Sequence, residues 1–317
     1  MRVVIIGGTG HIGSFLTPML VEAGLEVFCV SRGLKKPYRQ DKAWQKVRRI
    51  DLDRTSEEKE ATFGERIAAL DGEVVIDLTC YTPESAMQLT EALSGRIGHL
   101  LQCGTIWVHG HSVEVPTTEE APRSPFGEYG IQKAAIERYL LREAQENELP
   151  VTVLHPGHLV GPGWNPINPQ GNFDPNVFSA ILREEEITLP NIGMETVHHV
   201  HAEDVAQAFV DAITHRDQVL GESFHVVSPA ALTLRGYAEA MFAFFEQPVK
   251  LQFLPYEQWS RAVSEKNART TWDHIAHSPN CSIVKARNLL GYAPRYSSIQ
   301  AIQESVQWLR ENGIVSA

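Results

Sequence analysis

Apolar and polar positions in the first half of the chain follow two alternating patterns. Short apolar runs, the first at residues 3–6, indicate buried parallel strands. Stretches with apolar residues every three or four positions indicate helices, the first from Ile12 to Leu20 and ended by Gly24. Further strands are predicted at 26–30, 74–78, 99–103 and 151–154, with helices at about 59–70, 84–94 and 129–145. Strands that alternate with helices predict an α/β fold whose doubly wound parallel sheet carries helices on both faces.

A glycine-rich turn, GGTGHIG, joins the first predicted strand to the first predicted helix. Glycines at this place permit a tight turn and let the backbone approach a pyrophosphate, which the amides at the helix N-terminus stabilise. The alternative is an ordinary glycine-rich turn, but the position between a strand and a helix favours dinucleotide binding. The candidate cofactor-binding residues here are Gly7, Thr9, Gly10, His11, Ile12 and Gly13.

The chain changes in character after Gly157. The segment LVGPGWNPINPQGNFDP is rich in proline, glycine and asparagine, which predicts a long irregular loop of the kind that binds ligands. We interpret residues 1–164 as a Rossmann-type dinucleotide-binding domain and residues 165–317 as a smaller C-terminal α/β substrate-binding lobe, some segments of which return to the sheet. Helices are predicted in this lobe at about 175–184, 203–214, 234–245, 284–290 and 299–311.

Composition narrows the classes of partner. The 317 residues, 43% of them hydrophobic, can bury a sizeable core, and the formal net charge of −11 argues against nucleic-acid and anionic-membrane binding. A small molecule is the expected partner. The four cysteines stand far apart without metal-binding spacing, so we expect reduced, buried thiols. With no membrane span or signal-peptide core in the apolar pattern, we expect a cytoplasmic protein.

The end of the second predicted strand bears on the choice of cofactor. It reads CVSRG, without the acidic residue that holds the ribose hydroxyls of NAD. Ser31 and Arg32 can instead hold a 2′-phosphate, since an arginine fork matches phosphate geometry, so NADP is the first choice and NAD the second. A solvated basic loop is the alternative. Asp51, followed by Leu52, is a further candidate, either as an acceptor for the adenine amine or as a turn residue.

Tyr129 and Lys133 stand four positions apart at the start of the helix predicted at 129–145, so they share one helical face. A phenol with a pKa near 10 is a poor base at neutral pH. An ammonium at about 4 Å and an effective dielectric near 20 contributes about 4 kcal/mol, or roughly three pKa units. The pair therefore has a mechanism for proton transfer, although the same spacing also arises by chance in many helices.

Six segments in order resemble the extended short-chain dehydrogenase/reductase family, the epimerase and dehydratase group: GGTGHIG, GTIWVHG, YGIQK, HPGHLVGPG, HHVHAEDVA and LLGYAPRYS. The resemblance implies that Thr105 positions a substrate hydroxyl, that Tyr129 transfers the proton, and that Lys133 binds the nicotinamide ribose and lowers the pKa of Tyr129. It further implies a cofactor wall and a homodimer formed through the helix that bears Tyr129. The residues of that wall are Leu78, Thr79, Pro156, Gly157 and His158.

The sequence also departs from the family pattern. Gly104 stands where the family has the first of two serines, and His109 replaces a tyrosine. The arginine that commonly holds a nucleotide diphosphate is absent, and Val197 and His198 occupy that region. A sugar-like substrate is therefore expected, with a nucleotide sugar left open.

Histidines concentrate in HVHGHS, HPGH and HHVH. If the last segment is a strand, His199 and His201 share a face and could build a metal site with His158. Hydrogen bonding to substrate or backbone is the favoured alternative, so no metal is predicted. The candidate substrate-binding residues are Thr105, His109, His158, Trp164 and Asn172.

These observations predict an NAD(P)-dependent oxidoreductase or epimerase in which Tyr129 takes a proton from a substrate hydroxyl while hydride passes to nicotinamide. Epimerisation and redox chemistry are favoured over dehydration. The rival prediction is a catalytically silent, NADP-binding regulatory or RNA-associated relative. The presence of Thr105, Tyr129 and Lys133 together, with the acidic net charge, disfavours the rival.

Overall fold

The computed structural model describes residues 1–317, and a seven-stranded parallel sheet forms its larger part. The strand order is β11-β6-β5-β4-β1-β2-β3. β2 and β3 lie on one side of β1 and β4, β5 and β6 on the other, which is the arrangement of a doubly wound sheet. This confirms the predicted fold class. The strands are β1 (Arg2–Ile6), β2 (Glu26–Ser31), β3 (Arg48–Asp51), β4 (Val74–Asp77), β5 (His99–Cys103), β6 (Val151–Pro156) and β11 (Ser223–Val226).

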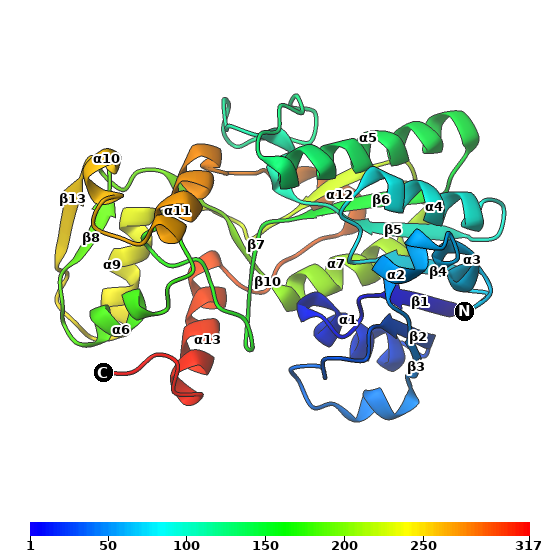
Figure 1. Cartoon of the computed structure of the whole chain (residues 1–317), viewed down its shortest axis with the longest axis horizontal. Helices are drawn as coiled ribbons and strands as arrows, with labels where there is room; N and C mark the ends of the chain where they lie inside the picture. Colours follow the sequence, from blue (N-terminus) through cyan, green and yellow to red (C-terminus); the bar gives the residue numbers. More distant parts are fainter.

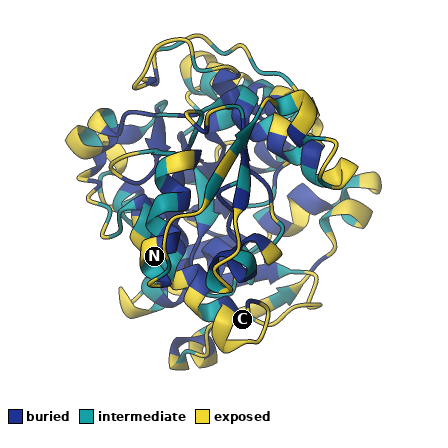
Figure 2. Ribbon diagram, turned by 90° about the vertical axis from the view of Figure 1, so that its left-hand side faces the viewer, coloured by how far each residue is buried: buried dark blue, intermediate teal, exposed yellow.

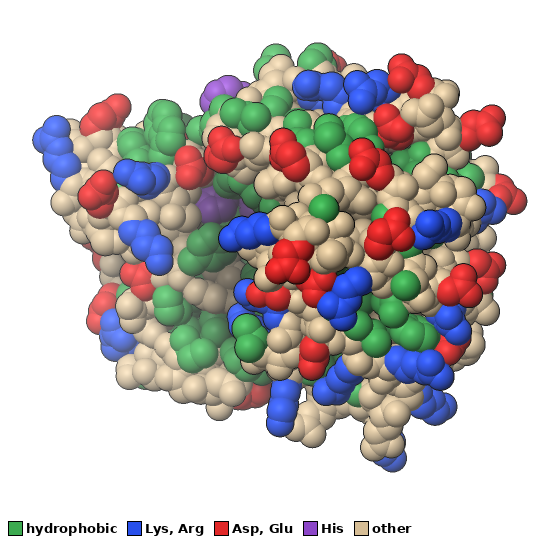
Figure 3. Space-filling view, turned by 45° about the vertical axis from the view of Figure 1, so that its right-hand side comes forward, with side chains coloured by type: hydrophobic (Ala, Val, Ile, Leu, Met, Phe, Trp, Pro, Cys, Tyr) green, Lys and Arg blue, Asp and Glu red, His purple; other side chains and the backbone are tan.

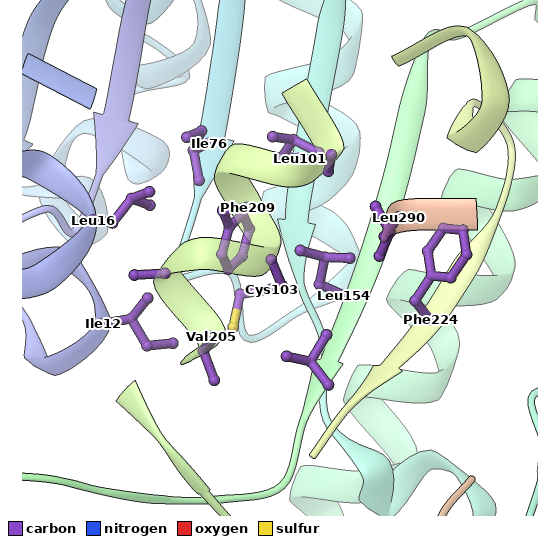
Figure 4. Close-up of a cluster of buried hydrophobic side chains, with 14 of the residues drawn as sticks. Ile12, Leu16, Ile76, Leu101, Cys103, Leu154, Val205, Phe209, Phe224 and Leu290 are labelled. Atoms are coloured by element: carbon purple, nitrogen blue, oxygen red, sulfur yellow. The ribbon is translucent and has the colours of Figure 1, made fainter. Parts of the chain in front are cut away.

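Two layers of helices cover the sheet because successive side chains of each strand point to opposite faces (Figure 1). On one face Val3 and Ile5 of β1 pack with helices α1, α7 and α12, and Figure 4 shows Phe209 of α7 among Leu16, Ile76 and Leu101. On the other face Val4 and Ile6 pack with α3, α4 and α5. The helices are α1 (His11–Glu22), α3 (Phe63–Ala68), α4 (Pro83–Leu93), α5 (Glu128–Asn147), α7 (Ala202–Thr214) and α12 (Val284–Leu290).

A smaller lobe stands beside the carboxyl ends of the central strands, on the left of Figure 1, and has a core of its own. Phe178, Tyr237, Phe242 and Ile302 are fully buried in it. Its elements are α6 (Asn176–Leu182), β8 (Ile187–Pro190), β9 (Thr196–Val197), β12 (Leu232–Thr233), α9 (Leu234–Phe244), β13 (Leu251–Leu254), α10 (Tyr256–Trp259), α11 (Glu265–His277) and α13 (Ser298–Glu311).

The chain passes more than once between the lobe and the sheet. β7 (His158–Val160) pairs in parallel with β10 (His199–His201), which leads into α7, and α8 (Arg216–Val219) precedes β11 on the main sheet. Residues 202–226 and 284–290 thus belong to the sheet layers although they follow residue 165. Buried residues gather in the middle of the molecule and exposed ones on its outer turns and helices (Figure 2).

Two predicted features differ from the structure. The helix expected at about 59–70 is shorter, since only α3 forms within it, and a separate helix, α2 (Arg54–Lys59), precedes it; Ala61, with a left-handed φ of 53°, lies between the two. α11 was not predicted, because its buried face includes Thr271, His274 and His277, and polar residues conceal the helical period. Short 3₁₀ turns lie at Lys42–Lys46 and Ile106–His109.

All four cysteines are buried and free. None of the helices combines the length and the apolar character that crossing a bilayer requires.

Candidate active site

The glycine turn fits a diphosphate because its residues have no side chains that would block the approach of a ligand to the backbone. Gly7 has φ +87°, and a Cβ on it would lie 2.4 Å from Cγ2 of Thr79. A Cβ on Gly13 would lie 2.3 Å from the Gly8 carbonyl oxygen, so only glycine lets α1 approach β1 this closely. Helix α1 begins after Gly10 with no side-chain cap and no acidic residue in its first turn. Its N-terminus is therefore open to an anion.

The other residues predicted in this turn lie beside it. Thr9 is half-buried, whereas Ile12 packs in the sheet core. His11 is buried, with Nε2 3.2 Å from the Val160 carbonyl oxygen, and its ring stacks on Trp164 at a centroid distance of 4.8 Å. Trp164 thus brings the long loop after β7 against the start of α1.

The carboxyl ends of β2 and β3 lie side by side. Ser31 pairs in register with Asp51, and its hydroxyl accepts a hydrogen bond of 3.3 Å from the Gly33 amide. Arg32 is exposed next to them, and Leu52 is buried beneath. A side chain on Gly33 would meet the Asp51 carboxylate at about 3 Å, so this carboxylate faces the turn that follows Arg32. The predicted cofactor-selecting residues are therefore neighbours.

A cleft of about 350 Å³ lies between the sheet and the small lobe. Thr105, Tyr129, His158 and Trp164, predicted from separate motifs, all line it. Figure 3 shows a hollow between the two parts of the molecule, with hydrophobic and histidine side chains on its wall. A larger hollow of about 640 Å³ runs along α13 and shares no lining residue with the cleft, so the candidate chemistry lies in the smaller one.

Tyr129 and Lys133 lie on one face of α5, as the spacing predicts. The Tyr129 side chain is 45% exposed toward the cleft, whereas Lys133 is buried. The ammonium of Lys133 donates to the carbonyl oxygens of Cys80 at 2.8 Å and Cys103 at 2.9 Å. Its Nζ lies 5.8 Å from the centroid of the Tyr129 ring.

The pKa of Tyr129 shifts in the direction opposite to the one expected from Lys133 alone. Although the side chain as a whole is partly exposed, desolvation of the phenol within the cleft raises this pKa above its ordinary value, and the nearby Thr105 hydroxyl opposes the shift. The sequence argument assumed an ammonium about 4 Å away, but the structure commits Lys133 to two carbonyl groups beneath the ring. The protein's own groups therefore raise the pKa of Tyr129 instead of lowering it.

The predicted cofactor wall follows the ends of β4 and β6. Thr79, which packs against Gly7, donates its backbone N–H to the Asp77 carboxylate at 2.9 Å, and Leu78 precedes it. Pro156 ends β6, and Gly157 lines the cleft. A Cβ on Gly157 would lie 2.4 Å from the His198 carbonyl oxygen, which explains the glycine.

A buried polar chain behind Thr105 was not foreseen. The Thr105 N–H donates to Nδ1 of His155 at 3.0 Å, and Nε2 of His155 lies 2.9 Å from Oε1 of Glu137. Arg123 donates to both oxygens of Glu137, at 2.7 and 2.9 Å. Burial raises the pKa of Glu137, but His155 and Arg123 together hold it far below its ordinary value. Glu137 is therefore ionised, and it follows Lys133 by one further helical turn, a spacing visible in the sequence.

Two predicted substrate-binding residues do not reach the cleft. His109 is buried behind it, where its Nε2 lies 2.8 Å from Nε2 of His225. Asn172 is fully buried and donates to the Thr271 hydroxyl at 3.1 Å, while its Oδ1 accepts from Asn168 at 2.8 Å. Asn172 therefore organises the loop rather than facing a substrate. Asp174, two residues before α6, accepts from the Asn176 backbone amide at 3.0 Å.

The histidines of the three segments do not come together as one group. His199 lies beside His158, with ring centroids 5.7 Å apart, and neither ring has a hydrogen-bond partner. His201 instead stacks on Tyr296 and accepts from the Glu203 amide at the start of α7. No group of three histidine, cysteine or acidic side chains has metal-binding geometry.

Several lining residues were not among the predicted site residues. Thr270, Asp273 and His274 come from α11, which was not predicted, and Trp107 and Phe173 come from the turns after β5 and β7. An acidic residue and a histidine one position apart carry no signal by themselves. Their role follows only from the packing of α11 across the cleft.

Comparison with known proteins completes the description of the site. The sequence matches the NAD dependent epimerase/dehydratase family over residues 3–226, more than half of the chain. The protein belongs to this family. The resemblance predicted from the six segments is thereby confirmed, and with it an enzyme of the NAD-dependent epimerase/dehydratase type.

The proteins to which this chain is similar have names that describe different activities. The chloroplast stem-loop binding protein of 41 kDa b from Arabidopsis thaliana is 24% identical, over 96% of this chain and 78% of that protein. The 2'-dehydrokanamycin reductase of Streptomyces kanamyceticus is 23% identical, over 87% of this chain and 76% of that protein. The crystal structure of a UDP-glucose 4-epimerase from Thermotoga maritima with UDP-glucose superposes with a TM-score of 0.75 at 22% identity, covering 98% of this chain and 99% of that one. This last likeness shows a shared fold.

Proposed function

We propose that the protein is an NAD(P)-dependent oxidoreductase or epimerase that acts on a hydroxyl or carbonyl carbon of a sugar-like small molecule. The observation that carries the proposal is the convergence of Thr105, Tyr129 and His158 on one cleft, with Lys133 buried beneath it. Three separate sequence segments supply these side chains, and chance would not bring them to one place.

Each residue of the cleft has its own role in the proposed reaction. Thr105 orients the substrate hydroxyl, and the phenol oxygen of Tyr129 takes the proton of that hydroxyl as the carbon becomes a carbonyl. Bound nicotinamide supplies the hydride acceptor and the positive charge that favours the phenolate. Lys133 holds the nicotinamide ribose, and its ammonium adds to the same field. In the reverse direction Tyr129 returns the proton to the carbonyl oxygen.

The glycine turn and the open N-terminus of α1 fit the diphosphate of a dinucleotide. We further propose NADP over NAD, because Arg32 is free at the end of β2 and its guanidinium fits a 2′-phosphate. Asp51, at the end of β3 and facing the same turn, is the candidate acceptor for the adenine amine.

The proposal also includes a homodimer. Met87 of α4 and Ile131 of α5 are exposed on two helices that contact each other on the outer face of the sheet. Light scattering of the purified protein tests this point, and a monomer at all concentrations would refute it.

Replacement of Tyr129 by phenylalanine tests the function directly. The variant should bind NADP as the parent does and lose turnover in any reaction that the parent catalyses. Turnover retained at the parental rate would contradict the role of Tyr129. The matched control is Tyr139→Phe, which removes a hydroxyl from the same helix but outside the cleft.

RNA association is the rival prediction, and the similarity to the chloroplast stem-loop binding protein supports it. The net charge of −11 and the assembled Thr105, Tyr129 and Lys133 set favour an enzyme. Filter binding with a stem-loop RNA distinguishes the two, because salt-sensitive RNA binding with no cofactor reduction across a carbonyl and polyol panel would favour the rival.

A further inference from the structure

The charge inventory of the cleft separates classes of sugar-like substrate. Of the 13 residues that line it, Asp273 is the only one with a charged side chain, and there is no lysine or arginine. His158 and His274 also line the cleft, but burial lowers both pKa values, that of His274 to about 4. Both rings are therefore neutral at neutral pH, and the cleft presents a single negative charge.

The Asp273 carboxylate has no partner within the protein. It lies half-buried on α11, and no protein group donates a hydrogen bond to it. Arg269, one turn earlier, acts on Asp273 only through space; its guanidinium is 76% exposed and lies 3.4 Å from Glu265. A carboxylate left without a protein donor on the wall of the cleft can bind a cation or a hydroxyl of the ligand.

Aromatic side chains surround this charge. Trp107, Tyr129, Trp164 and Phe173 line the same cleft. Aromatic rings offer an apolar surface to the C–H face of a sugar and attract a cation through their quadrupole. The walls therefore suit a ring compound, and they reinforce the attraction of Asp273 for a positive group.

A nucleoside diphosphate finds no counter-charge here. Its two negative charges require arginine, lysine or helix N-termini to replace water. At the position where the family commonly has an arginine, Val197 is buried, and His198 has both ring nitrogens engaged, one with the Ser228 carbonyl oxygen at 2.8 Å and one with the Cys281 amide at 3.1 Å. Asp273 would repel the same diphosphate.

We propose that the cleft selects a sugar or cyclic polyol that bears an ammonium group, held by Asp273 among the aromatic walls, and that it rejects nucleoside-diphosphate sugars. This inference rests on the proposed function and names the substrate class of the same site.

Ligand competition on the full chain loaded with NADP tests the inference. The probes are glucosamine, its uncharged analogue N-acetylglucosamine, and UDP-glucose, with dissociation constants measured by saturation-transfer NMR. Glucosamine should bind about tenfold more tightly than N-acetylglucosamine, the effect of one partly exposed ion pair with a cation–π contact. UDP-glucose should not compete at concentrations that saturate glucosamine.

Asp273→Asn should abolish the preference for glucosamine, whereas Glu265→Gln, on the same helix but outside the cleft, should keep it. Equal melting temperatures of the two variants exclude misfolding as the cause. Tighter binding of UDP-glucose, no binding of glucosamine, or an unchanged ranking in Asp273→Asn would each overturn the inference. Cofactor reduction is measured separately. Turnover of UDP-glucose would overturn the inference but retain the proposed function. Selective binding of glucosamine without turnover of any polyol would retain the inference but overturn the proposed function.

Discussion

Gly104 and His155 offer a sharp test of the polar chain behind Thr105. A Cβ on residue 104 would lie 2.2 Å from Nδ1 and 2.6 Å from Cε1 of His155. His155 is fully buried and hydrogen-bonded through both ring nitrogens, to the Thr105 amide and to Glu137. The imidazole cannot turn aside without losing these bonds, so Gly104→Ala forces the two residues apart.

The expected destabilisation has two parts. Overpacking of a well-packed interior amounts to about 1–3 kcal/mol. Loss of one neutral and one charge-assisted hydrogen bond adds about 2–4 kcal/mol. Because the structure relaxes in part, we expect Gly104→Ala to lower the free energy of unfolding by about 3–5 kcal/mol. Movement of the Thr105 backbone should lower turnover as well.

Urea unfolding followed by circular dichroism measures the effect. Gly98→Ala, at the other end of β5, is the matched control, because its nearest contact would be 3.3 Å and its effect should stay within about 1 kcal/mol. Combining Gly104→Ala with His155→Ala removes the clash, so the double variant should be more stable than the sum of the single effects predicts, by roughly 2–3 kcal/mol. Strictly additive changes in the free energy of unfolding, or no effect of Gly104→Ala on stability, would refute this account of the polar chain behind Thr105.

Two further predictions concern the cofactor and acid stability. Arg32→Ala should weaken NADP binding by about tenfold or more and leave NAD binding nearly unchanged, as measured by calorimetry; equal losses for both cofactors would contradict the 2′-phosphate role. Burial lowers the pKa of ten histidines, several to about 4, so the unfolded chain takes up protons near pH 6.5 while the folded chain does not. The stability they provide is therefore full above pH 6.5 and lost as the pH falls toward 4, by on the order of 1 kcal/mol per pH unit for each histidine. Circular dichroism during acid titration should show cooperative unfolding within this range, and an unchanged signal down to pH 4 would contradict the neutral assignments. These histidines are His11, His99, His109, His158, His198, His199, His201, His225, His274 and His277.

The sheet and the glycine turn were predictable because their signals are local. β-Branched runs bounded by glycine define β1, and Gly10 and Gly13 are explained by close contacts with Gly7 and Gly8 within the same turn. The pairing of Tyr129 and Lys133 was equally predictable, since a helix places residues four apart on one face.

The rest of the site depends on contacts between distant segments. Gly104 is explained by His155, 51 residues further along the chain. Similarly, Asp273 matters only because α11 packs across the cleft, and the polar face of α11 hides its helical period. His109 shares a motif with cleft residues but lies behind them against His225. Sequence neighbours indicate which groups can interact, but not which of them the fold buries.

The direction of the Tyr129 pKa shift illustrates this point. Spacing places an ammonium near the phenol, but the folded chain desolvates the phenol, which raises its pKa, and engages the ammonium with two backbone carbonyl groups. The proposed chemistry therefore makes the oxidised cofactor responsible for the final lowering of this pKa.

Ultraviolet difference spectroscopy of tyrosinate formation tests that claim most directly. The protein is titrated from neutral to alkaline pH with NADP and, separately, with NADPH, which lacks the positive nicotinamide charge. The account predicts that one tyrosinate appears at lower pH with NADP than with NADPH, that Tyr129→Phe removes this signal, and that Lys133→Met shifts it to higher pH. Identical titrations with the two cofactors, or a signal that persists in Tyr129→Phe, would contradict it.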